Sequence, residues 1–150
     1  MAKFAYRMQS ILDIRYQLEM QAKMEFGRAQ MKLMAEEEKL GKLFDRKEAY
    51  LEEGRKIRSD ALHVDDLRDN RNAVLIMDEL IEMQKVQVAL AAKEAEAARL
   101  KLQEAMQERK MQEKLKEKAF EQFMYEENAA EGKAVDELTS YTYGQRGKGE

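Results

Sequence analysis

Residues 11–51 read ILDIRYQLEMQAKMEFGRAQMKLMAEEEKLGKLFDRKEAYL. Along this stretch, mostly apolar residues recur every three or four positions, and charged residues lie between them. The recurring positions advance 40 residues in 11 steps, a mean of about 3.6, which is typical of a straight helix and not of a tightly supercoiled pair. The stretch predicts one helix with a single buried face, from about residue 4 to about residue 57. The predicted stripe is Ile11, Ile14, Leu18, Ala22, Phe26, Ala29, Leu33, Glu36, Leu40, Phe44, Lys47 and Leu51.

A second stripe follows in the later half of the chain. It advances 31 residues in 9 steps and contains three consecutive small residues that would let another helix approach closely. Apolar residues return near position 120, so we expect a helix from about 72 (alternatively from 64) to at least 125 or to 140, and a flexible tail at 141–150. The stripe is Val74, Met77, Ile81, Gln84, Val88, Ala91, Ala95, Ala98, Leu102 and Ala105.

Between the two stripes lies a polar, acidic stretch without helical periodicity, which we expect to connect the helices over about 58–71. Gly54 is a candidate helix end, and Ser59 or Asp60 a candidate cap for the next helix. The helices have equal predicted lengths, so a reversal near residue 61 would let each cover the other's apolar stripe. The alternative is one unbroken helix in a dimer.

The composition agrees with long helices. The chain has no Pro, 7 Gly and 38% charged residues, so turns are few. We therefore predict an all-α fold, a long antiparallel two-helix coiled-coil hairpin with a C-terminal helical overhang. Residues 1–150 would form a single elongated domain.

Several functional classes are disfavoured by the same composition. Without Cys the chain has no disulfides, and no apolar run is long enough for a secretion signal or a membrane span. The net charge of −3 argues against a dedicated nucleic-acid binder. The charge is nevertheless uneven, because residues 1–58 carry 13 Lys and Arg against 10 Asp and Glu.

No catalytic, cofactor or metal site is predicted. Catalysis requires converging groups in a pocket, and two helices side by side offer none. His63, with Asp65 and Asp66, is the only candidate metal ligand set, and a single imidazole in a polar turn is far more often simply exposed. The stretch GQRGKGE at 144–150 lacks the spacing and the preceding strand of a phosphate-binding loop.

Apolar residues are concentrated at both ends of the chain. In an antiparallel hairpin residue 4 would lie opposite about residue 118, so the apolar stretch 4–14 would meet the region around Phe120 and Phe123. The two ends would then build one apolar tip, which extends into the overhang through Met124, Tyr125, Val135, Leu138, Tyr141 and Tyr143. A tip of this kind favours a partner that encloses it.

A second candidate interface lies near the joined end of the hairpin. Leu43, Tyr50, Ile76 and Leu80 occupy positions there that a two-helix stripe cannot all use. Leftover apolar residues gathered in one zone indicate a binding surface.

The N-terminal residues form a motif of two aromatics, Arg, Met, a polar pair, two aliphatics and a basic residue. These are Phe4, Tyr6, Arg7, Met8, Gln9, Ser10, Ile11, Leu12 and Arg15, and Glu19 and Ala22 continue the pattern. The motif resembles the start of the flagellar FliJ family, in which Leu or Met follows the Arg. The family's C-terminal signature is matched by Asp136, Glu137, Leu138 and Tyr143.

The resemblance implies a non-enzymatic stalk of the flagellar type III export apparatus. Its implied partners are the hexameric export ATPase, the cytoplasmic part of the export gate membrane protein, and export chaperones. No nucleic acid or direct membrane insertion is implied, and the chain would be cytoplasmic, peripheral at the membrane face of the flagellar base. The N-terminal motif, Phe123, Met124 and the C-terminal signature would contact the ATPase ring, and Leu43, Tyr50, Ile76 and Leu80 the gate.

Two other functions remain open at this point. One is a structural coiled coil that homodimerises as a spacer. The other is the equivalent stalk of a virulence type III secretion system, which shares the architecture. A folded monomer or weak dimer that stimulates an ATPase would separate the first hypothesis from the spacer.

Overall fold

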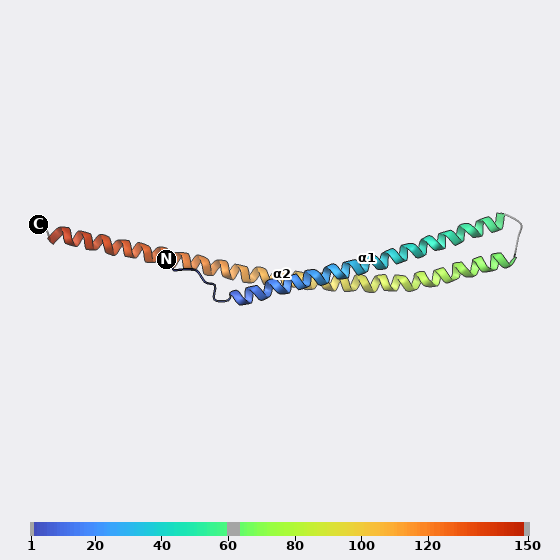
Figure 1. Cartoon of the computed structure of the whole chain (residues 1–150), viewed down its shortest axis with the longest axis horizontal. Coiled ribbons are helices and arrows are strands. Elements are labelled where there is room, and N and C mark those ends of the chain that lie inside the picture. The colour runs from blue at the N-terminus through green and yellow to red at the C-terminus, as the bar shows by residue number, and fades with distance from the viewer. Residues whose placement is uncertain (1, 60–63, 149–150) are drawn as a thin grey trace. The chain divides into compact units, whose positions relative to one another are not determined.

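Two helices account for nearly all of the chain in the computed structural model, which describes residues 2–59 and 64–148 (Figure 1). Helix α1 is Gln9–Ser59 and helix α2 is Val64–Lys148. No strand occurs within these two described ranges. The predicted all-α fold, with two long helices packed against each other as a coiled coil, is confirmed.

Helix α1 begins five residues later than predicted. Its first turn starts from hydrogen bonds of the Gln9 and Leu12 amides to the Tyr6 and Met8 carbonyls, and residues 2–8 precede it without helical structure. The aromatic ring of Phe4 packs against α2 instead of on an α1 turn. This contact explains why an apolar N-terminus does not extend the helix.

Helix α2 is longer than predicted at both ends. It begins at Val64, the alternative start, so most of the predicted connection is helical, and Asp65 and Asp66 place negative charge at the helix N-terminus, where the helix dipole favours it. Residues 141–148 are helical and not an irregular tail. Within the overhang the Thr142 hydroxyl donates to the Leu138 carbonyl at 2.8 Å. The predicted cap at Asp60 and the reversal near residue 61 lie outside the described residues.

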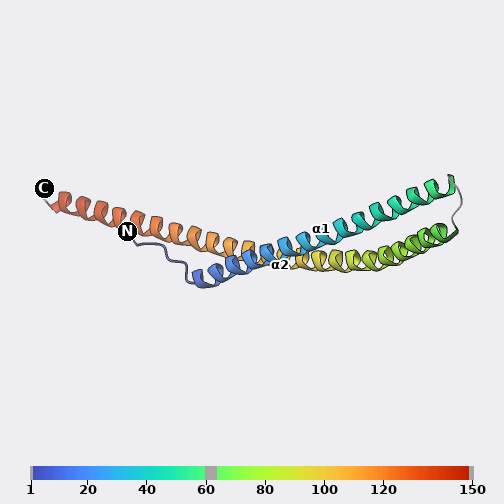
Figure 2. The same ribbon diagram turned by 45° about the vertical axis from the view of Figure 1, so that its right-hand side comes forward.

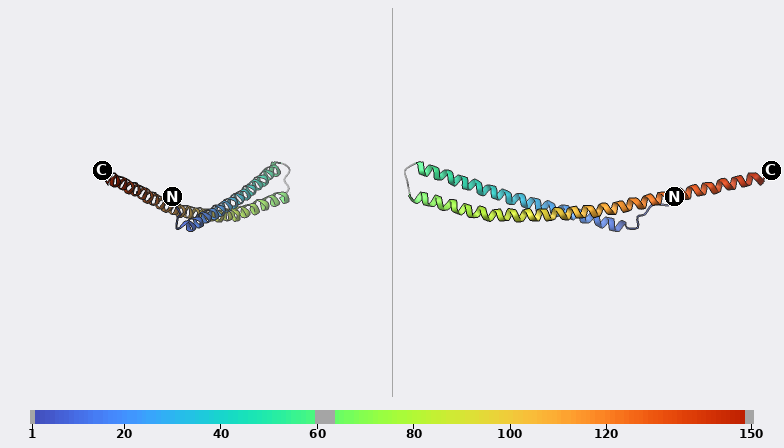
Figure 3. Two further views of the ribbon diagram at one scale, coloured as in Figure 1. Left: turned by 60° about the vertical axis from the view of Figure 1, so that its left-hand side comes forward. Right: turned by 180° about the vertical axis from the view of Figure 1, so that it is seen from behind.

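The chain divides into two units, which we describe separately. The hairpin unit is Met20–Glu104, and the terminal unit contains residues 2–19 and 105–148. In the hairpin unit α1 and α2 run antiparallel and side by side, as the different views agree (Figures 1, 2 and 3). The terminal unit joins the start of α1 to the later part of α2.

The covered stripe of α1 in the hairpin unit differs from the predicted one. It alternates steps of three and four residues without interruption and advances 35 residues in 10 steps, the 3.5-residue repeat of a left-handed supercoil. The predicted repeat of about 3.6 is therefore wrong here. Phe44 is exposed, while Leu43 and Tyr50 are covered. The observed stripe is Ala22, Phe26, Ala29, Leu33, Glu36, Leu40, Leu43, Lys47, Tyr50, Gly54 and Ile57, and Gly27 and the predicted Leu51 are half-buried beside it.

The covered stripe of α2 follows the prediction. Every predicted position from Val74 to Leu102 is buried or half-buried, and the stripe extends back through Leu67 and Asn70. Met77, Ile81, Ala91 and Ala95 are its most buried members. The small side chains let the α1 backbone come close, and burial of the larger ones supplies the apolar contact that holds the pair together.

Two amide side chains of the α2 stripe bond to backbone carbonyls of α1. Asn70 Nδ2 donates to the Tyr50 carbonyl at 2.7 Å, and Gln84 Nε2 donates to the Glu36 carbonyl at 3.0 Å. The donors are 14 residues apart on α2, and the acceptors are 14 residues apart on α1. A polar residue in a coiled-coil seam specifies register, so these bonds fix the alignment of the two helices.

Replacement of Gly54 should reveal how closely Asn70 packs on α1. A Cβ at Gly54 would lie 2.5 Å from Asn70 Oδ1, so Gly54→Ala would displace the amide and cost its hydrogen bond, about 1 kcal/mol. That loss offsets the gain of roughly 1 kcal/mol that Ala brings to a helix interior. We expect no stabilisation of Gly54→Ala in denaturant unfolding followed by circular dichroism.

Two other glycines of α1 serve as matched controls for this prediction. A Cβ at Gly27 or Gly41 would meet nothing within 4 Å. Each change to Ala there should therefore raise the free energy of unfolding by roughly 1 kcal/mol. In an Asn70→Ala background Gly54→Ala should do the same. A full stabilisation by Gly54→Ala in the native background would contradict this account.

Candidate partner-binding surfaces

The terminal unit brings the N-terminal segment against the later part of α2. The ring of Phe4 lies 5.2 Å from that of Phe120, edge to face, and 5.4 Å from that of Phe123. Aromatic pairs at such separations add stability beyond their buried area. The Tyr6 hydroxyl lies 3.5 Å from Gln112 Oε1 and donates a weak hydrogen bond. The N-terminus is thus attached to α2 by its two aromatic residues.

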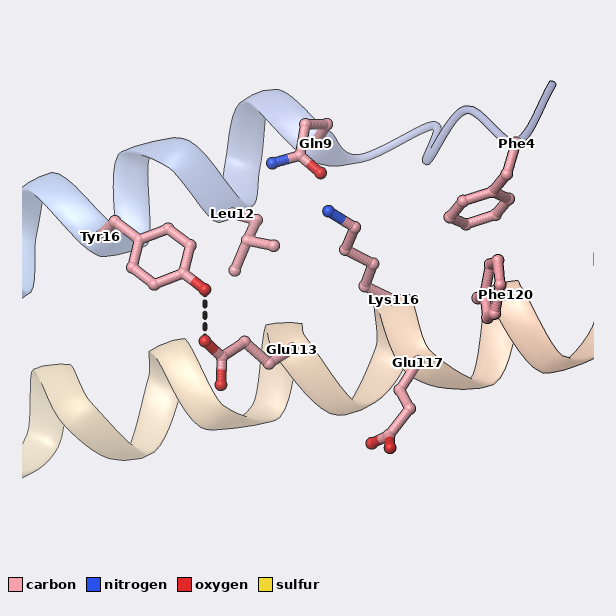
Figure 4. Close-up of a pocket in the computed structure, with 8 residues that line it drawn as sticks. All are labelled: Phe4, Gln9, Leu12, Tyr16, Glu113, Lys116, Glu117 and Phe120. Atoms are coloured by element: carbon pink, nitrogen blue, oxygen red, sulfur yellow. Dashed lines mark hydrogen bonds between the residues drawn. The ribbon is translucent and has the colours of Figure 1, made fainter.

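A groove of about 340 Å³ lies beside this attachment (Figure 4). The side chain of Leu12, only 2% exposed, points toward α2, with the rings of Phe4 and Phe120 at one end and Tyr16 at the other. Most of the lining is apolar, while charges from α2 stand at its rim. The groove is lined by Phe4, Gln9, Leu12, Tyr16, Glu113, Lys116, Glu117 and Phe120.

A buried ion pair lies next to the groove. Arg109 forms a bidentate pair with Glu19, through Nε to Oε2 at 2.6 Å and Nη2 to Oε1 at 3.2 Å, and Glu19 is only 5% exposed. The third nitrogen of Arg109 donates to Glu113 at 3.0 Å, and the Tyr16 hydroxyl donates to the same carboxylate. Four side chains from both helices therefore form one hydrogen-bonded network.

The network changes the proton affinities of its members. The hydroxyl of Tyr16 and the guanidinium of Arg109 hold the pKa of Glu113 below its ordinary value of 4.5. The bond to Glu113 raises the pKa of Tyr16, and the bond to Glu19 raises the pKa of Arg109. These shifts keep Glu113 ionised and keep Tyr16 and Arg109 protonated at neutral pH.

The sequence prediction missed this network. Glu19 and Arg109 occupy covered positions, where an apolar residue is expected. The predicted α1 stripe used Ile14 and Leu18 in place of Arg15 and Glu19, and the predicted α2 stripe ended at Ala105, before Arg109. The side chains of Ile14 and Leu18 are exposed. A charged residue at a stripe position of each helix was the available signal, because two such residues can pair across the interface.

The predicted ATPase-contact residues fall into two groups. Phe4, Leu12 and Phe123 are used inside the terminal unit, with Tyr6 and Ile11 half-buried beside them. The second group is exposed and available to another molecule: Arg7, Met8, Met124, Asp136, Glu137, Leu138 and Tyr143.

Within residues 2–59 and 64–148, no helix lies beside the overhang of α2. Every residue from 128 to 145 is exposed, and Val135, Leu138, Tyr141 and Tyr143 present large apolar side chains to solvent. The last half-buried residue of α2 is Glu127, a charged residue four positions past Phe123.

The four residues predicted at the joined end do not form one exposed surface. Leu43 and Tyr50 belong to the covered stripe of α1, whereas Ile76 and Leu80 are exposed on α2. The strict alternation of three and four residues from Leu40 puts Leu43 and Tyr50 in the stripe and leaves Phe44 outside it. Only the α2 half of the predicted interface remains accessible.

The remaining site predictions concern a metal site at His63 and a membrane span. His63 lies outside the described residues. Residues 2–59 and 64–148 contain no group of three or more His, Asp or Glu placed to hold a metal ion. Neither α1 nor α2, as described, has a segment that is both long and apolar enough to span a membrane.

Acid should destabilise the helix pair. Gln84 and Lys39 lower the pKa of Glu36, Arg99 lowers that of Glu96, and Tyr16 lowers that of Glu113. Because the folded chain binds these protons less readily than the unfolded chain, the stabilisation is present above about pH 4.5. It is lost as the pH falls through the folded pKa values.

Thermal melts by circular dichroism between pH 7 and pH 3 should show this loss as a falling melting temperature. Gln84→Met removes the main cause of the Glu36 shift and should flatten the profile. A melting temperature that is constant or rises between pH 5 and pH 3 would contradict the prediction.

Comparison with known proteins identifies the family. A family model described as "Flagellar FliJ protein" matches residues 4–148. No curated protein sequence matches the chain. A solved structure described as that of a candidate YscO homolog, CT670, from Chlamydia trachomatis has the same fold, with a TM-score of 0.66 and 20% identity. The alignment covers 99% of this chain and 100% of that one. Since the family model spans nearly the whole sequence, the chain belongs to the flagellar FliJ family.

Proposed function

We propose that this chain is a non-enzymatic stalk of the flagellar protein export apparatus, and that its terminal unit inserts into the pore of the hexameric export ATPase and stimulates it. The observation that carries the proposal is the unpaired overhang of α2. Its exposed Val135, Leu138, Tyr141 and Tyr143 have no partner within the described chain. Membership of the FliJ family supports an export role.

The physics of the overhang favours an enclosing partner. A helix of about 20 residues without tertiary contacts is marginally stable in water. Binding inside a ring would cover its apolar side chains and stabilise the helix at the same time. The Phe4, Phe120 and Phe123 cluster would anchor the base of the overhang, so that the ring meets a preformed structure.

The hairpin unit would face the rest of the apparatus. Ile76 and Leu80, exposed on α2, are the residues that we assign to contact with the cytoplasmic part of the export gate. Handling of export chaperones is a further role of this stalk. Its place would be the cytoplasmic face of the membrane at the flagellar base.

The proposal is tested by adding the purified chain to the purified export ATPase of the same cell. We expect the rate of ATP hydrolysis to rise in proportion to the chain bound, until about one chain is bound per ring. The chain alone should hydrolyse no ATP. Absence of both binding and stimulation would refute the ring-insertion proposal.

The fold likeness to a YscO homolog favours one second candidate, the corresponding stalk of a virulence type III secretion system. The same assay separates the two functions when the ATPases of both systems are compared. We expect stimulation of the flagellar enzyme, and stimulation of the virulence enzyme alone would reverse the assignment.

A further inference from the structure

One flank of the hairpin unit combines an apolar row with a basic row. The apolar row lies on α2 at helical spacing, and its large members are Ile76, Leu80, Met83 and Leu90, which are 53%, 37%, 66% and 49% exposed. The row continues to Ala97 and is interrupted by Gln87 and Glu94. Its steps of four and three residues place all of these positions on one face of the helix.

The basic row lies on α1 and follows the same spacing. Its steps are four and three residues, with Ala35 as the only uncharged position. The charged side chains are well exposed: the side chains of Lys32, Lys39 and Lys42 are 57%, 64% and 72% exposed. Each also pairs with a glutamate, namely Glu94, Glu36 and Glu38 in turn. The row is Arg28, Lys32, Lys39, Lys42 and Arg46.

A cross-helix ion pair shows that the two rows are neighbours. Lys32 Nζ lies 3.0 Å from Glu94 Oε2, so a member of the basic row touches one of the two polar positions that interrupt the apolar row. Lys39 lies one heptad after Lys32 on α1, and Gln87 lies one heptad before Glu94 on α2; Arg46 and Leu80 lie two heptads away in the same directions. In an antiparallel coiled coil with a 3.5-residue repeat, such pairs of positions face each other as Lys32 and Glu94 do. The rows therefore run alongside each other on one flank.

The opposite flank has a different character. There Lys47 pairs with Asp78 at 2.6 Å, and Lys85 Nζ lies 6.0 Å from the centroid of the Phe44 ring. Charges of both signs and an aromatic residue are mixed on that side. The separation of apolar and basic residues into two parallel rows is specific to the first flank.

We propose that this flank docks one acidic amphipathic helix of a partner protein. The helix would lay its apolar stripe on Leu80, Met83 and Leu90 and direct its carboxylates at the basic row. Helix-in-groove recognition uses apolar anchors at this spacing, and the cations supply orientation and faster association. This inference rests on the proposed function, which assigns Ile76 and Leu80 to contact with the export gate. It adds the chemistry of the partner segment that would bind there.

The observations favour a helix over two other occupants. An anionic membrane surface would meet Glu94 within the apolar row, and the row offers no aromatic side chain to anchor in a bilayer interface. A second copy of the chain meeting this flank face to face would bring like charges together. The exposed cations of the basic row favour an acidic partner, whose carboxylates would compete with the glutamates that pair with three of these cations.

The test uses the full chain and a 21-residue helical peptide with leucines at this spacing and glutamates along one side. A second peptide carries lysines in place of the glutamates. In titration calorimetry at low salt we expect the acidic peptide to bind at least tenfold more tightly. Met83→Glu should weaken that binding at least tenfold, and Lys39→Glu with Arg46→Glu should abolish the preference for the acidic peptide.

Two control variants lie off the rows on the same stretch of α2. Val86→Glu changes an exposed apolar residue, and Lys85→Glu reverses an exposed cation on the other flank. Both should change the affinity less than twofold, and helicity by circular dichroism should be equal in all variants. Failure of the gate protein to bind, with the peptide results intact, would reject the gate assignment and leave this inference standing.

The inference is overturned by any of four results. Two of them concern the peptides: the chain binds both with equal affinity, or it binds neither. The other two are that the chain binds only to vesicles in which one third of the lipid is phosphatidylserine, or that the chain self-associates and Met83→Glu abolishes the self-association.

Discussion

Truncation of the chain after Tyr125 is expected to abolish stimulation of the export ATPase while leaving the helix pair intact. The last apolar residue of the covered stripe of α2 is Phe123, so the truncated chain keeps the contacts of Phe4 with Phe120 and Phe123. Of the residues it loses, Glu127 is half-buried and 128–145 are exposed. The melting temperature should change by less than roughly 2 °C, because burial within the helix pair is unchanged.

Point variants distinguish the effect of the overhang's apolar side chains on stimulation from the effect of its length. Val135→Ser with Leu138→Ser removes exposed apolar surface and should reduce stimulation at least tenfold, because that surface is what the ring would cover. Lys133→Ser, between these changes and the base of the overhang, is the matched control and should have little effect. Full stimulation by the chain that ends at Tyr125 would show that the ring engages the molecule elsewhere.

Arg109→Ala should cause the largest loss of stability among single substitutions. It removes the bidentate partner of Glu19, whose carboxylate is 5% exposed, and also a partner of Glu113. A buried charge that loses its main partner is strongly destabilising. We expect the melting temperature to fall on the order of 10 °C.

Arg99→Ala on the same helix provides the comparison. Arg99 pairs with Glu96 one turn away, and both side chains are about half exposed, so its loss should change the melting temperature by no more than roughly 2 °C. Glu19→Leu with Arg109→Leu replaces the pair by apolar side chains and should recover most of the loss. Equal falls in melting temperature for Arg109→Ala and Arg99→Ala would mean that the buried pair contributes no more to stability than an exposed pair.

The sequence predicted the two helices and the covered face of α2, because Val74, Met77 and Ile81 are apolar residues at covered positions. On α1 it failed at particular positions: it placed Leu18 in the stripe instead of Glu19, and it ended the stripe before Gly54. The reason is physical, because an analysis of one helix cannot show that a charge has a partner, or that a missing side chain has a neighbour, on another helix.

The sequence predicted only part of the candidate site. The antiparallel register alone predicted that residue 4 would lie near Phe120 and Phe123. The network of Tyr16, Glu19, Arg109 and Glu113 depends on side-chain geometry, which no periodicity encodes. Helix boundaries failed for a third reason: the favourable interaction of Asp65 with the helix dipole lets a helix begin where apolar patterning is absent.

The paired amides of the hairpin unit have a mechanical consequence. If α1 slid along α2 by one heptad, Gln84 would lose its hydrogen bond to the Glu36 carboxylate, because the residues one heptad from Glu36 are Ala29 and Leu43. Asn70 would also meet a residue with a side chain in place of Gly54. Under an axial load the two helices would therefore move together without slip, and force applied to either would be carried by both.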